Sequence, residues 1–392
     1  MKSRNLIYWL IIAFSISAMG QVRVSGSFQT SVYSFERPDA VQQGDFYQAL
    51  RLKMFSNSYP QLALNTYLRV AKQGNASWNE RLYNLYADWK DAKNVVQVRL
   101  GRQFVYKGVI NGTMDGALVS ASPLKNLKIG AFLGVEAPFN REMRLVSTDS
   151  SAVGGFLAYR FSRKLAVDLS YFQRQRNSLN IWHLAGAALH GEVRKDLFYQ
   201  VQIDHNMETE KLQGMRYRLN YYISKWSFTG EYDFQRPRVW EDSYFRIFSS
   251  SREYQQYRGA VTYDLDPVQI GAQYLFTDYE YDQASQVILN AGNRWGLIGL
   301  VFQGGYAGDN TGVYGDIRYP VMSNLTLKLY GSYNNYQRHL VEISEDAIAF
   351  SGGVDFRPWE FLSLMADVEQ SSNSFYDNDV RGLFRMLYWF RR

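Results

Sequence analysis

Apolar and polar residues alternate with period two along nearly the whole chain, and this pattern constrains the fold more than any other feature. A clear example begins at Leu325, where every second residue as far as Leu329 is apolar and Lys328 lies between them. The same alternation fits six other segments: 197–204, 215–222, 226–234, 257–263, 313–319 and 362–369. Such segments are typical of β-strands with one apolar face. Their charged face requires water or a polar interior.

Composition excludes several other classes of protein. The 392 residues include no cysteine and only 8 proline, with 16% aromatic residues and a mean hydropathy of −0.33. Without cysteine the chain cannot carry disulfides, a thiolate zinc site, an iron–sulfur cluster or covalent c-type haem. The negative hydropathy argues against a bundle of transmembrane helices. A net charge of +6 is too small to indicate nucleic-acid binding.

Residues 1–20 are predicted to be a secretory signal peptide. Lys2 and Arg4 form a basic region, Leu6–Ile16 is apolar, and small residues at Ala18 and Gly20 place the expected cleavage before Gln21. The alternative is an uncleaved anchor, although the apolar stretch is short for a membrane span. We therefore expect an exported protein whose folded part is 21–392.

A soluble β-sandwich would show the same alternation, but three features favour a membrane barrel. The strand-like segments continue without a linker, and aromatic residues such as Trp226 and Phe234 lie at the ends of the apolar faces. Short turns alternate with long polar loops along the chain. We predict an all-β, single-domain, transmembrane antiparallel up-and-down barrel of about 16–22 strands, with both termini at the short-turn end. Chain length alone suggests roughly 16–18 strands. The alternation is weakest at Gln286–Trp295.

Two features resemble the bacterial outer-membrane porin-like β-barrel family. Gly101-Arg102-Gln103 and Asp115-Gly116 resemble a strand–loop–strand passage of that family, and the chain ends in an aromatic strand up to Phe390, although two arginines follow where an aromatic residue is usual. The resemblance implies that 105–113 folds inward as a constriction loop, with Tyr106, Lys107 and Asn111 near the narrowest point. Gly108 and Gly112 would give it the required backbone freedom. The alternative is an ordinary outer loop.

If the apolar faces meet lipid, the opposite faces line a lumen. Basic candidates come from the first strands and the last, and acidic candidates come from the middle of the chain, where arginines interrupt them. A basic wall opposite a partly acidic one would screen ions by charge, whereas pairing across neighbouring strands would cancel the effect. The predicted pore-lining residues are Arg51, Lys53, Arg69, Arg99, Lys107, Lys128, Asp168, Asp204, Arg216, Arg218, Glu231, Asp233, Arg258, Lys328, Arg381 and Arg385.

The sequence offers little support for catalysis or metal binding. None of the four histidines has a convincing partner: Ala185 occupies the position two residues after His183, and Asp204 and His205 lie on opposite strand faces. No metal-ligand spacing or nucleotide fingerprint occurs. We expect neither enzymatic activity nor a cofactor.

The expected function is therefore passive diffusion. A porin of the outer membrane of a Gram-negative bacterium would contact lipid and pass small hydrophilic solutes or ions, and its basic sector suggests a mild anion preference. The alternative is a porin-like sheath around a multihaem cytochrome in an electron conduit. Such a sheath would need a wide lumen filled by its partner, and neighbouring genes rich in haem-binding motifs would favour it.

Overall fold

The structure is a computed structural model that describes residues 22–36, 41–143, 150–236, 253–306, 308–337, 343–374 and 376–391. The predicted signal peptide at 1–20 lies outside the described residues, so it stays a prediction. Among the described residues, no helix has the length and apolar character needed to cross a bilayer.

Twenty-two β-strands of 10–16 residues make up the described chain. The first half comprises β1(Val22–Glu36), β2(Gln42–Ser56), β3(Leu62–Gln73), β4(Asn79–Lys90), β5(Val96–Lys107), β6(Ile110–Leu124), β7(Leu127–Glu136), β8(Ser150–Arg160), β9(Ala166–Arg176), β10(Leu179–Arg194) and β11(Leu197–Asn206). The second half comprises β12(Lys211–Ile223), β13(Trp226–Gln235), β14(Tyr254–Asp264), β15(Gln269–Tyr279), β16(Asp282–Asn293), β17(Gly296–Gly305), β18(Asp309–Met322), β19(Leu325–Gln337), β20(Ser344–Trp359), β21(Leu362–Asn373) and β22(Tyr376–Arg391).

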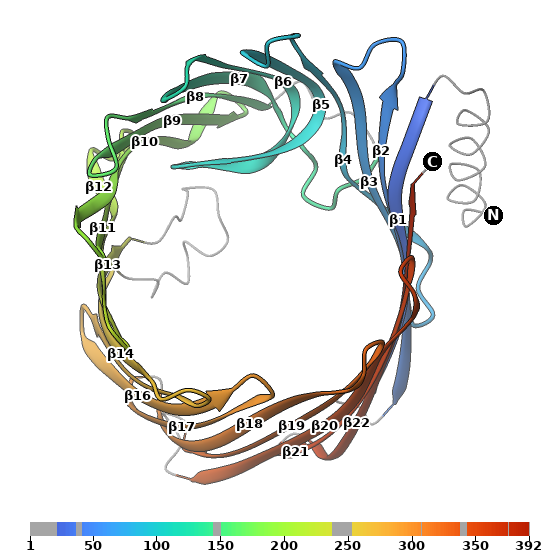
Figure 1. Ribbon diagram of the computed structural model, residues 1–392, viewed down its shortest axis with the longest axis vertical. Coiled ribbons are helices and arrows are strands. Elements are labelled where there is room, and N and C mark those ends of the chain that lie inside the picture. Colours follow the sequence, from blue (N-terminus) through green and yellow to red (C-terminus); the bar gives the residue numbers. More distant parts are fainter. Residues whose placement is uncertain are drawn as a thin grey trace.

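The strands form one closed antiparallel barrel (Figure 1). Each strand pairs with the next along the chain, and β22 returns to pair with β1, with Phe384 opposite Val32. Closure gives the backbone of every strand a partner on both sides, which is the condition for crossing hydrocarbon. The predicted fold class is confirmed, and the 22 strands lie at the upper end of the predicted range. The estimate from chain length was too low because the strands are short and most connections are tight.

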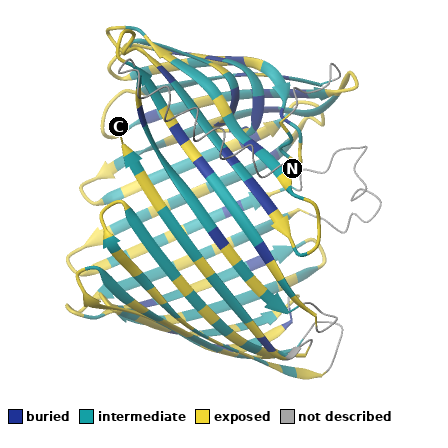
Figure 2. Cartoon of the chain, turned by 90° about the vertical axis from the view of Figure 1, so that its right-hand side faces the viewer, coloured by how far each residue is buried: buried dark blue, intermediate teal, exposed yellow. Residues whose placement is uncertain are grey.

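The two ends of the barrel differ in their connections. At one end, which we call the short-turn end, ten connections of two to five residues join β2 to β3, β4 to β5 and so on to β20 and β21. β1 begins and β22 finishes at this same end. At the other end, the loop end, the connection between β13 and β14 reaches 18 residues. The strands run obliquely to the barrel axis, as is normal for closed sheets (Figure 2).

Successive residues point to opposite sides of the wall. On β12, Leu219 is 52% exposed on the outer face, while its neighbour Arg218 donates a hydrogen bond from Nε to Glu231 of β13 at 2.7 Å on the other face. The outer face carries most of the exposed large apolar side chains, as expected for a surface in contact with lipid.

Candidate functional site: the lumen and its inward hairpin

The loop-end parts of β5 and β6 leave the wall and fold into the barrel (Figure 1). The bend falls where Gly101 pairs with Gly116. Gly101 has φ +121°, and a Cβ there would lie 2.3 Å from the carbonyl oxygen of Leu85. A Cβ on Gly116 would lie 2.2 Å from the carbonyl oxygen of Leu133. Only glycine fits both positions, so the sequence itself fixes where the two strands turn inward.

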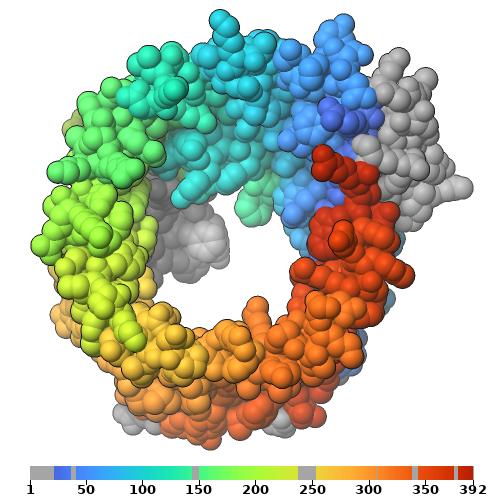
Figure 3. All heavy atoms as spheres, in the orientation of Figure 1, coloured from blue at the N-terminus to red at the C-terminus, as the bar shows by residue number. Residues whose placement is uncertain are grey.

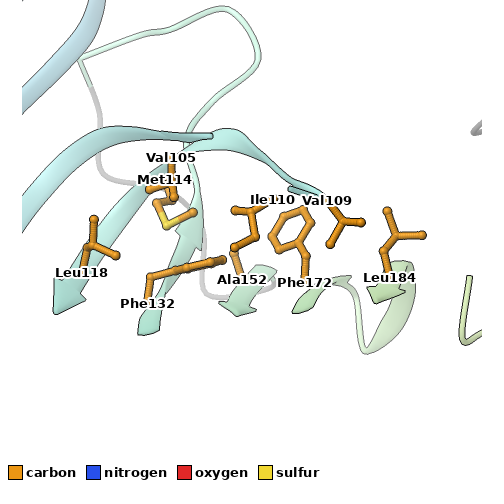
Figure 4. Packing of buried hydrophobic residues seen from close by; sticks show 9 residues of the cluster. All are labelled: Val105, Val109, Ile110, Met114, Leu118, Phe132, Ala152, Phe172 and Leu184. Atoms are coloured by element: carbon orange, nitrogen blue, oxygen red, sulfur yellow. The ribbon is translucent and has the colours of Figure 1, made fainter. Parts of the chain in front are cut away.

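The tip of this inward hairpin docks on the inner surface of β7–β10. Val109 and Ile110 are almost completely buried, and they pack with Phe172 and Leu184 of the wall in one apolar cluster (Figure 4). The backbone N–H of Val109 also donates a hydrogen bond to Ser170 Oγ at 3.0 Å. Burying two such side chains contributes about 3–6 kcal/mol by area, which is enough to hold the hairpin against the wall.

The docked hairpin identifies the inner face of every strand. Because it lies inside the ring and contacts Phe132, Phe172 and Leu184, these wall residues point inward. Period-two alternation along each strand and the pairing register between strands then extend this assignment around the barrel. All the predicted pore-lining residues that belong to the wall share this inner face, and Lys107 belongs to the hairpin.

The prediction that 105–113 folds inward is confirmed, and the alternative of an ordinary outer loop is wrong. While Val105 faces the wall, Phe104 and Tyr106 on the opposite face of the hairpin are 55% and 67% exposed. Lys107 and Asn111 are exposed as well. Asn111 lies opposite Tyr106 on the hairpin face that is turned to the lumen, whereas Lys107 lies opposite Ile110 on the face that is turned to the wall. That Tyr106, Lys107 and Asn111 mark the narrowest point stays a prediction.

The departure of β5 leaves part of the β4 edge without a strand partner, and this opening is closed in another way. Pairing between β4 and β5 extends only to Leu85 opposite Arg102. Beyond it, the N–H of Leu82 donates to the carbonyl of Arg141 at 2.7 Å. Arg102 donates from Nη1 to the carbonyls of Leu82 and Glu142, at 3.3 and 2.7 Å. One arginine and the segment after β7 therefore seal the wall.

Several predicted basic residues contact aromatic rings instead of carboxylates. The Cζ of Arg51 lies 4.6 Å from the ring centroid of Tyr67, that of Arg69 lies 4.4 Å from Tyr47, and Lys53 Nζ lies 4.7 Å from Phe55. None of these three cations forms an ion pair within the described chain. Lys128 on β7 is close enough to Lys107 and Arg99 for their charges to repel. The inner face of β2–β7 thus has an excess of positive charge.

In the middle of the chain, opposite charges pair across neighbouring strands. Arg216 Nη2 lies 2.5 Å from Asp233 Oδ2 and Arg218 Nη2 lies 2.7 Å from Glu231 Oε2. Arg258 Nη1 is 3.7 Å from the same Glu231 oxygen. Asp204 is nearly buried and accepts from Gln202 Nε2 at 3.1 Å. The interrupting arginines therefore neutralise Glu231 and Asp233, the acidic residues of β13.

Other predicted residues also have counter-charges. Lys328 lies between Asp355 and Asp367, at 3.2 and 2.7 Å. Arg381 Nε is 2.5 Å from the fully buried Asp379, and Arg99 Nε is 3.5 Å from Asp88. Arg385 lies on the same face of β22 as Arg381, and its Nε is buried without a hydrogen-bond partner in the described structure.

Two histidines have partners that the sequence did not reveal. His190 Nδ1 lies 3.5 Å from Asp168 Oδ2 on the inner face, and His183 Nε2 lies 3.0 Å from the hydroxyl of Tyr171 on the outer face. The expectation that both lack a partner is wrong because Asp168 and Tyr171 come from the neighbouring strand β9. Among the described residues, no group of three or more possible ligands is arranged to hold a metal ion.

The lumen is open along its axis. Figure 3 shows a passage through the ring of strands, narrowed on one side by the hairpin. Outside the wall, aromatic rings gather at the short-turn end: Trp226 lies 4.4 Å from Tyr263, and Phe361 contacts Trp359 and Tyr388 at 5.7 and 5.8 Å between centroids. Rings in this position are typical of barrels whose aromatic girdle lies at a membrane interface.

A solved pore structure supports the fold assignment. The translocation pore of the P pilus usher PapC aligns over 94% of this chain and 99% of its own, with a TM-score of 0.55 and 8% identity. OccK5 (OpdH) of Pseudomonas aeruginosa aligns over 95% of this chain and 99% of its own, with a TM-score of 0.45 and 11% identity. OpdQ of the same organism aligns over 94% and 99%, with a TM-score of 0.48 and 9% identity.

No protein-family model matches the sequence, and no curated protein does. At 8% identity the likeness to the usher pore shows a shared fold and nothing about solutes. The fold defines the class of this protein as a large closed β-barrel. A single closed β-barrel is the fold that the sequence predicted.

Proposed function

We propose that this chain is an outer-membrane porin through which small hydrophilic solutes or ions diffuse passively, with a preference for anions. The observation that carries the proposal is the combination of an apolar outer face with an open, charged inner passage. A barrel with these two faces is stable in a bilayer and holds water inside. Neither a cofactor nor catalysis is part of this function.

The excess positive charge on the inner face of β2–β7 supports the anion preference. Because the charges on β12–β14 pair with one another, the cations Arg51, Lys53 and Arg69, which form no ion pair within the described residues, dominate the field in the passage. Fixed charge along a water-filled pore favours ions of opposite sign, most strongly at low ionic strength, where screening is weak.

Conductance in planar bilayers tests the proposal. The refolded barrel is expected to give large, steady, ohmic current steps. In a tenfold KCl gradient, the reversal potential is expected to have the same sign as the equilibrium potential of chloride. A reversal potential of the opposite sign would refute the anion preference. Absence of conductance from a barrel shown to be folded by heat-modifiable migration would refute the open porin. It would favour the sheath, which purification of the native complex and a haem absorbance spectrum would then test.

A further inference from the structure

Arg51, Tyr67 and Tyr83 form a stacked column on the inner wall. The guanidinium of Arg51 lies over Tyr67 at 4.6 Å, and Tyr67 stacks on Tyr83 with centroids 4.7 Å apart and rings inclined by 21°. The three residues come from β2, β3 and β4 in turn, and Arg51 is directly opposite Tyr67 in the strand register. Stacking of this kind orders the long arginine side chain before any ligand arrives.

A second stacked pair lies nearer the loop end. Arg69 lies 4.4 Å above the ring of Tyr47, and Tyr47 donates its hydroxyl proton to Asp45 Oδ2 at 2.7 Å. Asp45 is 4% exposed and also accepts from Gln43 Nε2 at 2.9 Å and from the N–H of Gly74 at 3.0 Å. The ring of Tyr47 is therefore held by a fixed carboxylate, and Arg69 is positioned on it.

The two guanidiniums are oriented without being neutralised. Neither Arg51 nor Arg69 forms an ion pair within the described chain, whereas Arg216, Arg218 and Arg258 on the other side each lie within 3.7 Å of an acid. Arg69 also hydrogen-bonds the hydroxyl of Tyr83, whereas Arg51, held through its face, keeps its N–H edge free for donation within the described residues. That edge matches a carboxylate, which can accept two parallel hydrogen bonds from it.

This part of the wall also faces the passage. The inward hairpin covers β7–β10 and leaves β2–β4 beside the opening (Figures 1 and 3). Arg51 is exposed, while Tyr47, Tyr67 and Tyr83 are partly exposed. A solute that crosses the lumen can therefore reach both the cations and the aromatic rings.

We infer that Arg51, Arg69, Tyr47, Tyr67 and Tyr83, the Arg–Tyr wall, form a binding site for solutes that carry a carboxylate on a ring. This inference rests on the proposed channel function and names its substrate class. The carboxylate accepts from an arginine edge, and the ring packs on the exposed planar groups of the wall. Neither feature alone suffices, because chloride and acetate cannot stack and neutral rings cannot accept from both N–H groups.

The first test measures interruption of the ionic current by added solutes. Benzoate and glucuronate, which distinguish an aromatic from a sugar ring, are compared with acetate and with benzyl alcohol at equal concentration. At least one ring carboxylate is expected to block at a concentration tenfold or more below that of acetate and of benzyl alcohol. If acetate blocks the current at the same concentration as the ring carboxylates, the Arg–Tyr wall is a general anion-binding surface and the inference is overturned.

Variants locate the site. R51Q and Y67L are each expected to raise the blocking concentration of the ring carboxylate about tenfold. The matched control is R258Q, which removes one inner-face arginine from the opposite wall and is expected to leave the blocking concentration unchanged. An equal effect of R258Q and R51Q would overturn the assignment to β2–β4.

Calorimetric titration of the detergent-solubilised barrel with the same solutes separates the two proposals, because binding does not require conduction. A folded barrel that binds benzoate or glucuronate but conducts no current would refute the proposed porin function and support the binding site. A conducting barrel without preferential binding of ring carboxylates would refute the binding site and support the porin function.

Discussion

Arg102 and Asp115 form a bidentate ion pair at the base of the inward hairpin. Nε lies 2.7 Å from Oδ1 and Nη2 lies 2.8 Å from Oδ2, and the two side chains are only 4% and 8% exposed. They face each other in the β5–β6 register one residue beyond the paired Gly101 and Gly116. The pair thus holds the two strands together at the step where both leave the wall.

Removing one partner of this pair is expected to destabilise the barrel strongly. Asp115→Asn leaves the Arg102 charge buried without its counter-charge, and breaking a buried pair in this way costs about 3–5 kcal/mol. The measurement is the urea midpoint of the refolded barrel in detergent. The control is Arg318→Gln, which breaks an exposed pair with Asp316 and is expected to cost less than about 1 kcal/mol. Equal midpoints for the two variants would contradict a structural role for Arg102.

Filling the space between the wall and the hairpin tip is expected to narrow the channel. A Cβ on Gly186 would lie 2.5 Å from Val109 Cγ1, so Gly186→Ala pushes the tip away from the wall into the passage and should lower single-channel conductance. Gly112→Ala is the matched control, because a Cβ there meets nothing within 4 Å. Shortening Val109 to alanine in the Gly186→Ala background should restore the original conductance. If Gly186→Ala conducts like the unmodified chain, the tip does not limit the passage.

Charge selectivity should shift in opposite directions when opposite walls are altered. Arg51→Gln with Arg69→Gln removes two unpaired cations and is expected to lower the anion-to-cation permeability ratio severalfold. Asp233→Asn leaves Arg216 without its closest counter-charge, 2.5 Å away, and is expected to raise that ratio. Reversal potentials at low ionic strength measure both, and both shifts should shrink near 1 M KCl, where the screening length is about 3 Å. A shift of the same sign for both variants would contradict this assignment.

The turn between β4 and β5 is expected to lose stability in acid. Asp91 Oδ1 accepts the N–H of Val96 at 2.7 Å, and this backbone hydrogen bond holds the pKa of Asp91 below its ordinary value. The sign follows from linkage: the stabilisation is present above the pKa of an unfolded aspartate, about 3.9, and is lost as the pH falls through the lower pKa of the folded state. Asp91→Ala should therefore lower the urea midpoint at pH 7 and have little effect at pH 2. An equal effect at both pH values would contradict the contribution of the ionised carboxylate.

Much of the wall was predictable from the sequence because period two and lipid contact both act locally. The alternation that begins at Leu325 corresponds to β19, and its apolar residues lie on the outer face. The alternation is weak around Gln286 because the inner face of β16 carries Ile288, which lies between Gln273 and Val301 in the register. Where both faces of a strand are apolar, the pattern loses its period, although the strand still forms.

The arrangement inside the barrel was less accessible to sequence reasoning. Alternation places Arg216 on the inner face, but its pairing with Asp233 depends on the strand register, which the turn after Ile223 sets. The glycines near 101–116 indicated that a segment could fold inward. Its docking surface, at Ser170 and Leu184, lies some 60 to 75 residues further along the chain. The stacking of arginines on tyrosines likewise depends on neighbours across strands, which composition cannot identify.

The closure of the β4 edge by Arg102 and the segment after β7 has a consequence for engineering. A loop that merely hangs inside a barrel can be deleted to enlarge the pore. Here Arg102 belongs to the same strand as the inward tip, and its contacts to Leu82 and Glu142 join parts of the wall that no strand joins. Excision of 101–116 would therefore remove part of the enclosure itself, and the product would be a barrel with a lateral breach.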